Sequence, residues 1–430
     1  MHRLNTRDPG FERAFRRLVS DRRESDEDVA RDVEVILADV RNRGDAALAE
    51  LTERFDGHVL ATDADWSLSP EACREAFDAL KPDLRAALEL AATRIRAYHE
   101  AQRPTDRDET DELGVRMGAR WTAVDAAGLY VPGGRAAYPS SLLMNAIPAK
   151  VAGVERLVVV TPANKGQVNP LVLAAAHLAG VDEVWRIGGA QAVAALAYGT
   201  QRIRPVDVVV GPGNAWVAEA KRQLYGVVGI DMVAGPSEIL LIADGRNDPD
   251  WTAADLLSQA EHDPAAQSIL ITDDAVFADT VADRIGVELA MLPTARVASE
   301  SWNAHGTIIE VANLDEAPAL ANALAAEHVQ IATDDPEALF RKIRHAGSVF
   351  LGRMTPEAVG DYVAGPNHVL PTGRRARFSS GLSVLDFMKR TSFIQLDEAA
   401  LHAVGPAAVE LADAEGLGAH ARSIQVRLGQ

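Results

Sequence analysis

The stretch RLVVVTPANKGQVNPLVLAAAHLAGVDEVWRIG (156–188) decides the fold. It begins with a short β-branched run, continues with an apolar helical segment at 169–180, and ends with a second β-branched run at 181–188. Alternating strand and helix patterns of this kind are typical of a parallel sheet that is covered by helices on both faces. We therefore expect an α/β fold.

The same alternation extends along most of the chain. The run VDVVVGPG (206–213) continues the first block, and the pattern restarts at EILLIAD (238–244). Further strand-like runs follow at 267–273, 306–311, 328–333 and 347–352. The two blocks predict two α/β units that meet near DMVAGPSE (231–238).

The segments outside these blocks have a different character. Helical spacing of apolar residues covers 27–44 and 81–102, and a polar connector follows at 103–114. Residues 360–392 are rich in Gly, Pro, Ser and Asn, and a loop of this length is usually functional or disordered. Its aromatic and apolar residues argue against disorder. The tail at 396–428 is again helical, with a break at EGLG.

Composition limits the classes of partner. The 430 residues carry a formal net charge of -19, which argues against nucleic acid as the main partner, because a phosphate backbone needs a basic surface. No apolar run reaches the roughly 18 residues that a membrane span needs. The start MHRLNTRDPG does not resemble a signal peptide. We expect a cytoplasmic protein with no membrane partner.

Two residue types are unusually rare. Only six of the 43 basic residues are lysines, while acidic residues number 62. A GC-rich genome explains the arginine bias as well as an adaptation to high salt does, but the acid excess favours an acidic, halophile-like surface. The single cysteine, Cys73, can form neither an internal disulfide nor a zinc thiolate cluster.

Glycine turns lie at the ends of three predicted strands, at 131–139, 187–196 and 211–222. Ligands of open α/β sheets usually bind at the carboxyl edge, where such turns lie, and helix N-termini can hold phosphate there. None of the turns matches G-x-G-x-x-G, since GPGNAW lacks the third glycine. For any one of them a plain tight turn is an equally good interpretation, but three in one block favour a nucleotide.

The first candidate metal ligands lie in DLLSQAEHD (255–263), a stretch whose pattern predicts the end of a helix. Gln259 and His262 are three residues apart and so share one helical face, although a solvated helix end is the simpler explanation. Later donors are Asp361, His368, Glu415 and His420. A set of oxygen and nitrogen donors without sulfur suits zinc or manganese with room for substrate.

A candidate acid–base pair lies in AAEHVQI (325–331). Glu327 and His328 are adjacent, and neighbours along a strand point to opposite faces. The two side chains can therefore share a site only at a strand end or in a loop. Histidine can act as a general base near neutral pH, whereas a polar strand edge is the simpler alternative.

Six motifs join these features, and with them nearly the whole chain resembles the histidinol dehydrogenases. In order they are GPGNAWVAEAKR, IDMVAGPSEILLIAD, DLLSQAEHD, AAEHVQI, GDYVAGPNHVLPTGRRARFSSGLSVLDFMKRTS and EGLGAHARSI. That family oxidises L-histidinol through L-histidinaldehyde to L-histidine and reduces two NAD per turnover. The resemblance implies two incomplete Rossmann-like domains, similar to those of aldehyde dehydrogenases, with small N- and C-terminal helical segments.

The resemblance also implies roles for individual residues. One zinc per subunit would be held by Gln259, His262, Asp361 and His420. The acid–base pair would be Glu327 and His328. Substrate contacts would come from Ser237, Gln259, His262, His328, Asp361, His368, Glu415 and His420. NAD contacts would come from Tyr130, Gln191 and Asn214. The family forms a homodimer in which the C-terminal segment crosses over, so that His420 would bind zinc in the other subunit's site.

Domain boundaries follow from the same resemblance. Residues 1–26 would form an N-terminal helical segment, and 27–110 together with 236–375 the first α/β domain, with the zinc and catalytic residues. Residues 111–235 would form the second, NAD-binding domain. Residues 376–430 would form the segment that crosses the dimer.

The aldehyde step raises the question of a nucleophile. Cys73 lies in a predicted helix far from every motif, so addition of water with Glu327 as general base is the expected route. Zinc is expected mainly to orient the substrate. Two alternatives remain open: a relative that oxidises another amino alcohol or a sulfonated alcohol, and a zinc hydrolase in which Glu327 activates metal-bound water.

Overall fold

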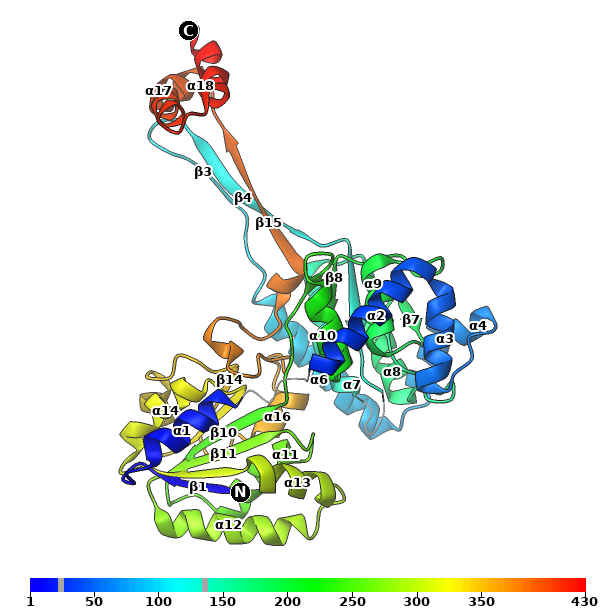
Figure 1. The fold of residues 1–430 in the computed structure, drawn as a ribbon, viewed down its shortest axis with the longest axis vertical. Helices are drawn as coiled ribbons and strands as arrows, with labels where there is room; N and C mark the ends of the chain where they lie inside the picture. Colours follow the sequence, from blue (N-terminus) through cyan, green and yellow to red (C-terminus); the bar gives the residue numbers. More distant parts are fainter. Residues whose placement is uncertain (22–26, 134–137) are drawn as a thin grey trace.

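Two α/β lobes and a long arm make up the computed structural model, which describes residues 1–21, 27–133 and 138–430 (Figure 1). The first lobe is built on a sheet of order β1-β12-β11-β10-β13-β14 and is called here the 238–351 lobe. The second is built on a sheet of order β2-β7-β6-β5-β8-β9 and is called the 126–230 lobe. The expected α/β class with two parallel-sheet units is confirmed.

The 238–351 lobe has a wholly parallel sheet. Its strands are β1 (His2–Asn5), β10 (Glu238–Ala243), β11 (Gln267–Thr272), β12 (Thr307–Glu310), β13 (His328–Ala332) and β14 (Ser348–Leu351). The helices α11 (Pro249–Ala260), α12 (Ala275–Leu289) and α13 (Ala295–His305) pack on one face. The helices α1 (Phe11–Ser20) and α14 (Ala317–Leu324) cover the other. Alternate residues of each strand supply the two cores, as strand geometry requires.

The 126–230 lobe repeats this layering. Its strands are β2 (Ser67–Leu68), β5 (Ala126–Tyr130), β6 (Arg156–Val160), β7 (Glu183–Trp185), β8 (Val208–Val210) and β9 (Gly229–Ile230). All are parallel except β2, which pairs antiparallel with β7. One face carries α5 (Pro70–Asp78), α6 (Pro82–Glu100), α7 (Pro139–Ala152) and α8 (Pro170–Ala179). The other carries α2 (Glu27–Arg43), α3 (Asp45–Asp56), α9 (Gly189–Tyr198) and α10 (Ala215–Leu224).

The arm is an antiparallel ribbon that projects from the 126–230 lobe (Figure 1). Its strands are β3 (Arg107–Thr110), β4 (Arg116–Ala123) and β15 (Met388–Gln395), in the order β15-β4-β3. Its tip carries α17 (Glu398–Ala414) and α18 (Gly418–Gln425). A three-stranded ribbon without a second layer buries little apolar surface, so the arm exposes large apolar side chains such as Ile394 and Leu411.

The expected domain boundaries need correction in three places. Residues 27–100 pack on the 126–230 lobe and not on the 238–351 lobe, because α2 and α3 place apolar side chains such as Val33 and Leu48 in its core. The first residues are not only helical, since β1 pairs with β12 and extends the 238–351 sheet. Residues 107–123 belong to the arm, because β3 pairs with β4 and β4 pairs with β15 in a sheet separate from those of the two lobes.

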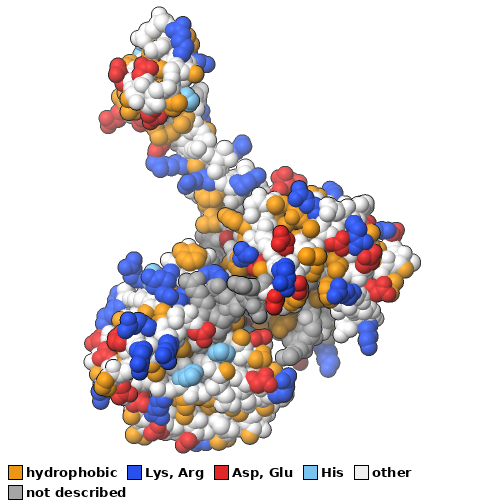
Figure 2. Space-filling model, in the orientation of Figure 1, with side chains coloured by type: hydrophobic (Ala, Val, Ile, Leu, Met, Phe, Trp, Pro, Cys, Tyr) orange, Lys and Arg blue, Asp and Glu red, His pale blue; other side chains and the backbone are white. Residues whose placement is uncertain are grey.

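The charge of the surface and the length and apolarity of the helices concern two kinds of partner, nucleic acids and membranes. On the face drawn in Figure 2, acidic and basic side chains are interspersed over both lobes, and no broad basic area stands out. Among the described helices, none combines the length and the apolarity that a bilayer crossing requires.

Candidate functional site

The candidate site lies at the amino ends of β10 and β13, which are paired neighbours in the 238–351 sheet. Glu327 directly precedes β13 and His328 is its first residue, so the adjacent pair lies at a strand end as sharing one site requires. Ser237 directly precedes β10, and its backbone carbonyl accepts a hydrogen bond from Gln267 N at 3.0 Å. Because Ile239 pairs with His328, Glu327 lies beside Glu238, the residue that follows Ser237.

Glu327 is held by reciprocal hydrogen bonds with Glu238. The backbone N–H of Glu238 donates to Glu327 Oε2 at 2.9 Å, and the backbone N–H of Glu327 donates to Glu238 Oε2 at 3.3 Å. Burial raises the pKa of Glu327 well above its ordinary value, and the nearby carboxylates of Glu238, Asp361 and Glu357 raise it further. A carboxylate whose pKa is raised is a stronger base than an ordinary one.

His328 is oriented by the same strand. Its Nδ1 lies 3.1 Å from the backbone carbonyl oxygen of Glu238, which can only accept, so Nδ1 carries the proton and Nε2 presents a lone pair. Burial lowers the pKa of His328 to about 4, and the ring is therefore neutral at pH 7. Nε2 lies 3.4 Å from Glu357 Oε1 but makes no hydrogen bond among the described residues. His328 is thus a neutral, oriented base.

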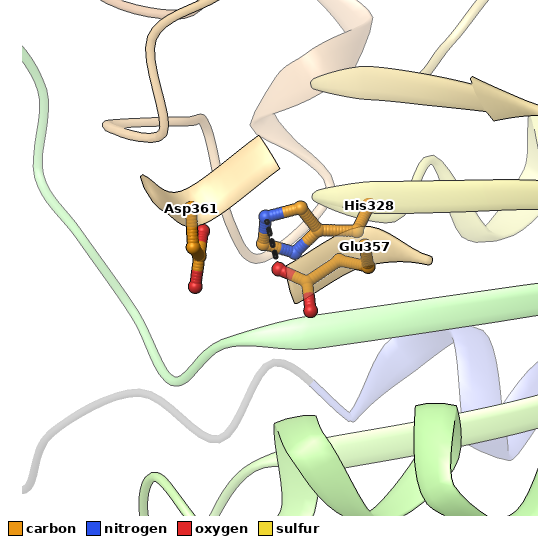
Figure 3. A group of neighbouring side chains, drawn as sticks. All are labelled: His328, Glu357 and Asp361. Atoms are coloured by element: carbon orange, nitrogen blue, oxygen red, sulfur yellow. Dashed lines mark ion pairs between the residues drawn. The ribbon is translucent and has the colours of Figure 1, made fainter. Parts of the chain in front are cut away.

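Helix α16 (Glu357–Tyr362) adds two carboxylates, from Glu357 and Asp361, to the same place. They are four residues apart and so lie on one helical face. With His328 they offer ligand atoms that all lie within 4.8 Å of one another. Figure 3 shows the three side chains gathered in one place. Burial, followed by the charge of Asp361, raises the pKa of Glu357 to about 8. Glu357 was missed from the sequence, although the i, i+4 spacing in PEAVGDY (356–362) is a usable signal.

Two histidines expected at the site lie around this cluster. His368 Nδ1 is 2.9 Å from the backbone oxygen of Asp361 and 3.6 Å from its carboxylate Oδ1. Burial lowers the pKa of His368, and a charge on His262 acts in the same direction. His262 itself is exposed just beyond α11, close enough for its charge to affect His328 as well. The structure therefore brings Asp361, His262 and His368 together with the acid–base pair.

Gln259 approaches from α11. Its neighbour Ser258 has its hydroxyl oxygen 3.5 Å from Glu357 Oε2, which ties α11 to α16. Gln259 is 1% exposed, and its Oε1 has no hydrogen-bond partner among the described residues. His328 Nε2 and Glu357 Oε1 are also buried without such a partner. Buried polar atoms are normally satisfied, so three unsatisfied atoms on adjoining elements fit a bound cation or a polar ligand.

Glu415 and His420 are not brought to this site within one chain. Both are exposed, Glu415 at the end of α17 and His420 in α18, at the tip of the arm. Figure 1 shows the tip at the opposite end of the molecule from β10 and β11. If these residues act at a site, it must belong to another copy of the chain.

The residues expected to contact NAD surround one edge of the 126–230 sheet. Tyr130 ends β5, its hydroxyl accepts a hydrogen bond from Gly189 N at 3.1 Å, and burial raises its pKa to about 12. Gln191 is buried in α9. Asn214 is exposed and caps α10 by accepting from Val217 N at 3.1 Å. Of the expected turn at 131–139, residues 134–137 lie outside the described part.

The one cysteine lies away from this chemistry. Cys73 is buried in α5, within the core between that helix and α8, and burial raises the pKa of its thiol. A raised pKa disfavours the nucleophilic thiolate. Cys73 thus has a structural place in the 126–230 lobe.

Comparison with known proteins gives one consistent result. The family model for histidinol dehydrogenase matches residues 19–428. A histidinol dehydrogenase of Zymomonas mobilis is 63% identical over 428 residues, covering 100% of this chain and 99% of its own length. One of Ruegeria pomeroyi is 60% identical over 425 residues, covering 99% and 98%.

Solved structures agree with the sequence relatives. The crystal structure of histidinol dehydrogenase from Elizabethkingia anophelis matches with a TM-score of 0.94 and 34% identity, covering 100% of this chain and 98% of that one. A probable aldehyde dehydrogenase of Listeria monocytogenes matches with a TM-score of 0.50 and 12% identity, covering 90% and 97%. The second likeness concerns the fold alone, and it agrees with the expected similarity to aldehyde dehydrogenases.

Proposed function

The chain belongs to the histidinol dehydrogenase family, and from this premise we propose that it oxidises L-histidinol through L-histidinaldehyde to L-histidine, with NAD as the oxidant of both steps. The observation that carries the proposal is the state of His328. It is buried and neutral, its Nδ1–H is committed to the Glu238 carbonyl, and its Nε2 is free to accept a proton.

His328 serves as the base of both oxidations. In the first, the alcohol proton passes to His328 Nε2 as the carbinol carbon gives up its hydride. NAD supplies one function when bound, the acceptance of that hydride. A positioned base of this kind contributes on the order of 10²–10⁴-fold to the rate.

Glu327 activates the water that the second oxidation needs. An aldehyde has no transferable hydride until a nucleophile adds, so Glu327 takes a proton from water as the oxygen bonds to the carbonyl carbon. His328, protonated in the first oxidation, gives its proton to the former carbonyl oxygen, which completes the hydrate. The hydrate then loses its hydride while His328 again takes a hydroxyl proton, which leaves the carboxylic acid. The buried Glu327 carboxylate, with its raised pKa, is a stronger base than an exposed one.

The donor set fits one zinc ion per subunit. Gln259, His262 and Asp361 would hold it from this chain, and His420 would come from a second copy. A bound zinc would bind and orient the imidazole and amine of the substrate. The unsatisfied, buried Oε1 of Gln259 supports this set. Glu357, which is not among the expected ligands, lies in the same cluster as Asp361. Ser237, His368 and Glu415 would contribute the remaining substrate contacts.

The arm supports a homodimer with exchange of the C-terminal segment. It carries exposed His420 and Glu415 at its tip, together with exposed apolar side chains such as Leu411 and Leu417. A second copy would cover these side chains and receive the two polar groups. We also propose NAD contacts from Tyr130, Gln191 and Asn214, and a cytoplasmic location.

Counting the product tests this function. Purified protein with zinc should form two NADH for each L-histidinol consumed, and a chelator should abolish the reaction. A ratio of one would favour an enzyme that oxidises only the alcohol. Histidinol left unconsumed, with no rise in NADH absorbance, would favour the alternative of a zinc hydrolase.

A further inference from the structure

A buried ion pair in the 126–230 lobe has no part in the chemistry described above. Lys221 of α10 and Asp231, which directly follows β9, form an ion pair with side chains only 2% and 1% exposed. Burying two charges costs several kcal/mol per ion, and such a pair is often no more stabilising than apolar residues of the same size. Stability alone therefore does not explain it.

The pair holds both backbone polar groups of Gly211. Lys221 Nζ donates to the carbonyl oxygen of Gly211 at 3.0 Å, and the N–H of Gly211 donates to Asp231 Oδ2 at 2.8 Å. The other oxygen, Asp231 Oδ1, accepts from Met232 N at 2.6 Å. Every charged atom of the pair thus makes a hydrogen bond or ion pair. Together, the two side chains hold Gly211, the first residue after β8.

Gly211 has a backbone conformation and a place in the chain that few other residues could take. Its φ is +108°, a conformation that favours glycine, and a Cβ there would collide with the carbonyl oxygen of Tyr130. It opens the turn GPGN (211–214), which leads into the N-terminus of α10. Tyr130 on one side and Asn214 on the other are the proposed NAD contacts. The grip on Gly211 therefore fixes the spacing between them.

Asp231 also begins the segment that leaves this lobe for the other. Residues 231–237 connect β9 in the 126–230 sheet to β10 in the 238–351 sheet. β10 begins at Glu238, whose backbone orients Glu327 and His328. One buried carboxylate thus links the proposed nucleotide turn to the strand that carries the acid–base pair.

We propose that Lys221 and Asp231 are positioning residues for the dinucleotide, which they serve by holding the turn 211–214 at the carboxyl end of β8. The inference rests on the proposed use of NAD. A lysine suits the task because its compact ammonium group reaches one carboxylate and one carbonyl, where the broad guanidinium of arginine would need more room. This explains a lysine here in a chain whose basic residues are mostly arginine.

The test separates two effects: the loss of the hydrogen bonds to Gly211, and the cost of leaving one buried charge without its partner. The double variant Lys221→Met/Asp231→Leu leaves no unpaired charge in the core, yet it removes every bond to Gly211. In full-length, zinc-loaded protein, the Kd for NADH and the KM for NAD should rise roughly tenfold, the worth of about one charge-assisted hydrogen bond. The KM for L-histidinol and the kcat at saturating NAD should change little.

A second lysine–aspartate pair in the same lobe, only partly buried, serves as a control. Lys150 Nζ and Asp182 Oδ2 form an ion pair at 2.9 Å, and Asp182 Oδ2 also accepts from Leu157 N at 2.7 Å, at the amino edge of the sheet. The double variant Lys150→Met/Asp182→Leu should bind NADH like the wild type. Equal weakening in both double variants would overturn the proposal, because it would reflect general loosening of the lobe.

Two further outcomes are decisive. If the Lys221 and Asp231 double variant binds NADH with wild-type Kd while its Tm falls, the pair is only structural and the proposal is wrong. If that variant does not fold, Asp231→Asn keeps the side-chain shape and should still raise the Kd, and an unchanged Kd would overturn the proposal. Wild-type protein that binds no NADH would instead refute the proposed function, and the inference with it.

Discussion

Two groups of buried polar side chains, one in each lobe, differ in how completely they are hydrogen-bonded. In the 126–230 lobe, Lys221 and Asp231 neutralise each other and bond to the backbone of Gly211 and Met232. In the 238–351 lobe, a polar cluster is buried just as deeply but is left incomplete. Its atoms without a hydrogen-bond partner among the described residues are Gln259 Oε1, His328 Nε2 and Glu357 Oε1.

This difference distinguishes a pair that holds the backbone in place from a cluster that can bind a ligand. Each unsatisfied buried polar atom costs about 1–3 kcal/mol, and proteins accept such local conflict chiefly where function requires it. The completed pair can only hold the chain in place, whereas the incomplete cluster is ready for a ligand. Substitutions in the incomplete cluster should therefore change chemistry first, and the predictions below test that contrast.

Removing the base should have the largest effect. His328→Gln should lower kcat for both oxidations by about 10²–10⁴-fold, the usual contribution of a positioned base, while zinc and NADH still bind. Steady-state NADH formation from histidinol and from histidinaldehyde measures both steps. His177→Gln, at an exposed histidine of α8, is the control and should match the wild type. A kcat reduced only a few-fold would exclude His328 as the base.

Removing a proposed ligand should abolish metal and activity together. His262→Asn should lower zinc affinity and activity by at least roughly 100-fold, since even residues that only support a metal ligand contribute 10–100-fold. Metal content per subunit and activity measured on the same preparation check this. A variant that keeps its zinc and yet has no activity would assign His262 a different role.

Removing the water-activating group should affect one step more than the other. Glu327→Gln keeps an oxygen to accept from Glu238 N but cannot take a proton, so aldehyde oxidation should slow roughly 10²-fold more than alcohol oxidation. Single-turnover measurements on each substrate separate the steps. Equal slowing of both would argue against this role.

Glu357 should make stability depend on pH. Its pKa is about 8 when folded and near the ordinary 4.5 when unfolded, so between these values the folded state retains a proton that the unfolded state releases. The stability it contributes is fully present below pH 4.5 and is lost as the pH rises through 8. In metal-free protein, Glu357→Gln should reduce the fall in Tm between pH 5 and 8.5.

The matched control for that measurement is Glu337→Gln, at an exposed glutamate of α15 (Pro336–Phe340). It should leave the fall in Tm as large as in the wild type. If Glu357→Gln behaved in the same way, the proton held in the incomplete cluster would have to lie on another group.

The smallest effect is expected at the buried cysteine of the 126–230 lobe. Cys73→Ala should leave the rates of both oxidations unchanged, because the thiol is buried in α5 and the aldehyde step uses water. Loss of its packing should cost about 1 kcal/mol of unfolding free energy. Chemical denaturation and the two rates measure this, and a selective loss of aldehyde oxidation would restore cysteine as a candidate nucleophile.

The two lobes could be predicted from short patterns, and so could several residues that the structure brings together at the candidate site. The alternation that begins at 156–188 depends on strand and helix periods that the local sequence sets, and it led to both parallel sheets. Glu327 and His328 were expected at a strand end or in a loop, where sequence neighbours can share a site, and they lie at the start of β13. Glu357 was missed because its helix has only six residues, too few for a periodic pattern to stand out.

Packing across long sequence separations could not be predicted. Residues 27–100 were assigned to the wrong lobe, since an amphipathic helix such as α2 shows that it has an apolar face but not which sheet that face will cover. The pairing of β1 with β12 joins residues about 300 positions apart, and nothing local specifies such a partner. The hydrogen bonds of Lys221 and Asp231 to Gly211 depend on α10, β8 and the end of β9 lying together in the fold.

The sequence by itself therefore determined the class of fold and the family, and it supplied the proposed site residues, because these depend on short-range periodicity and on motifs in order. Tertiary structure alone decided which polar atoms are buried without a partner, which tautomer His328 adopts and which turn the buried ion pair holds. Those properties arise when distant segments exclude water together, and a linear pattern does not record which segments meet.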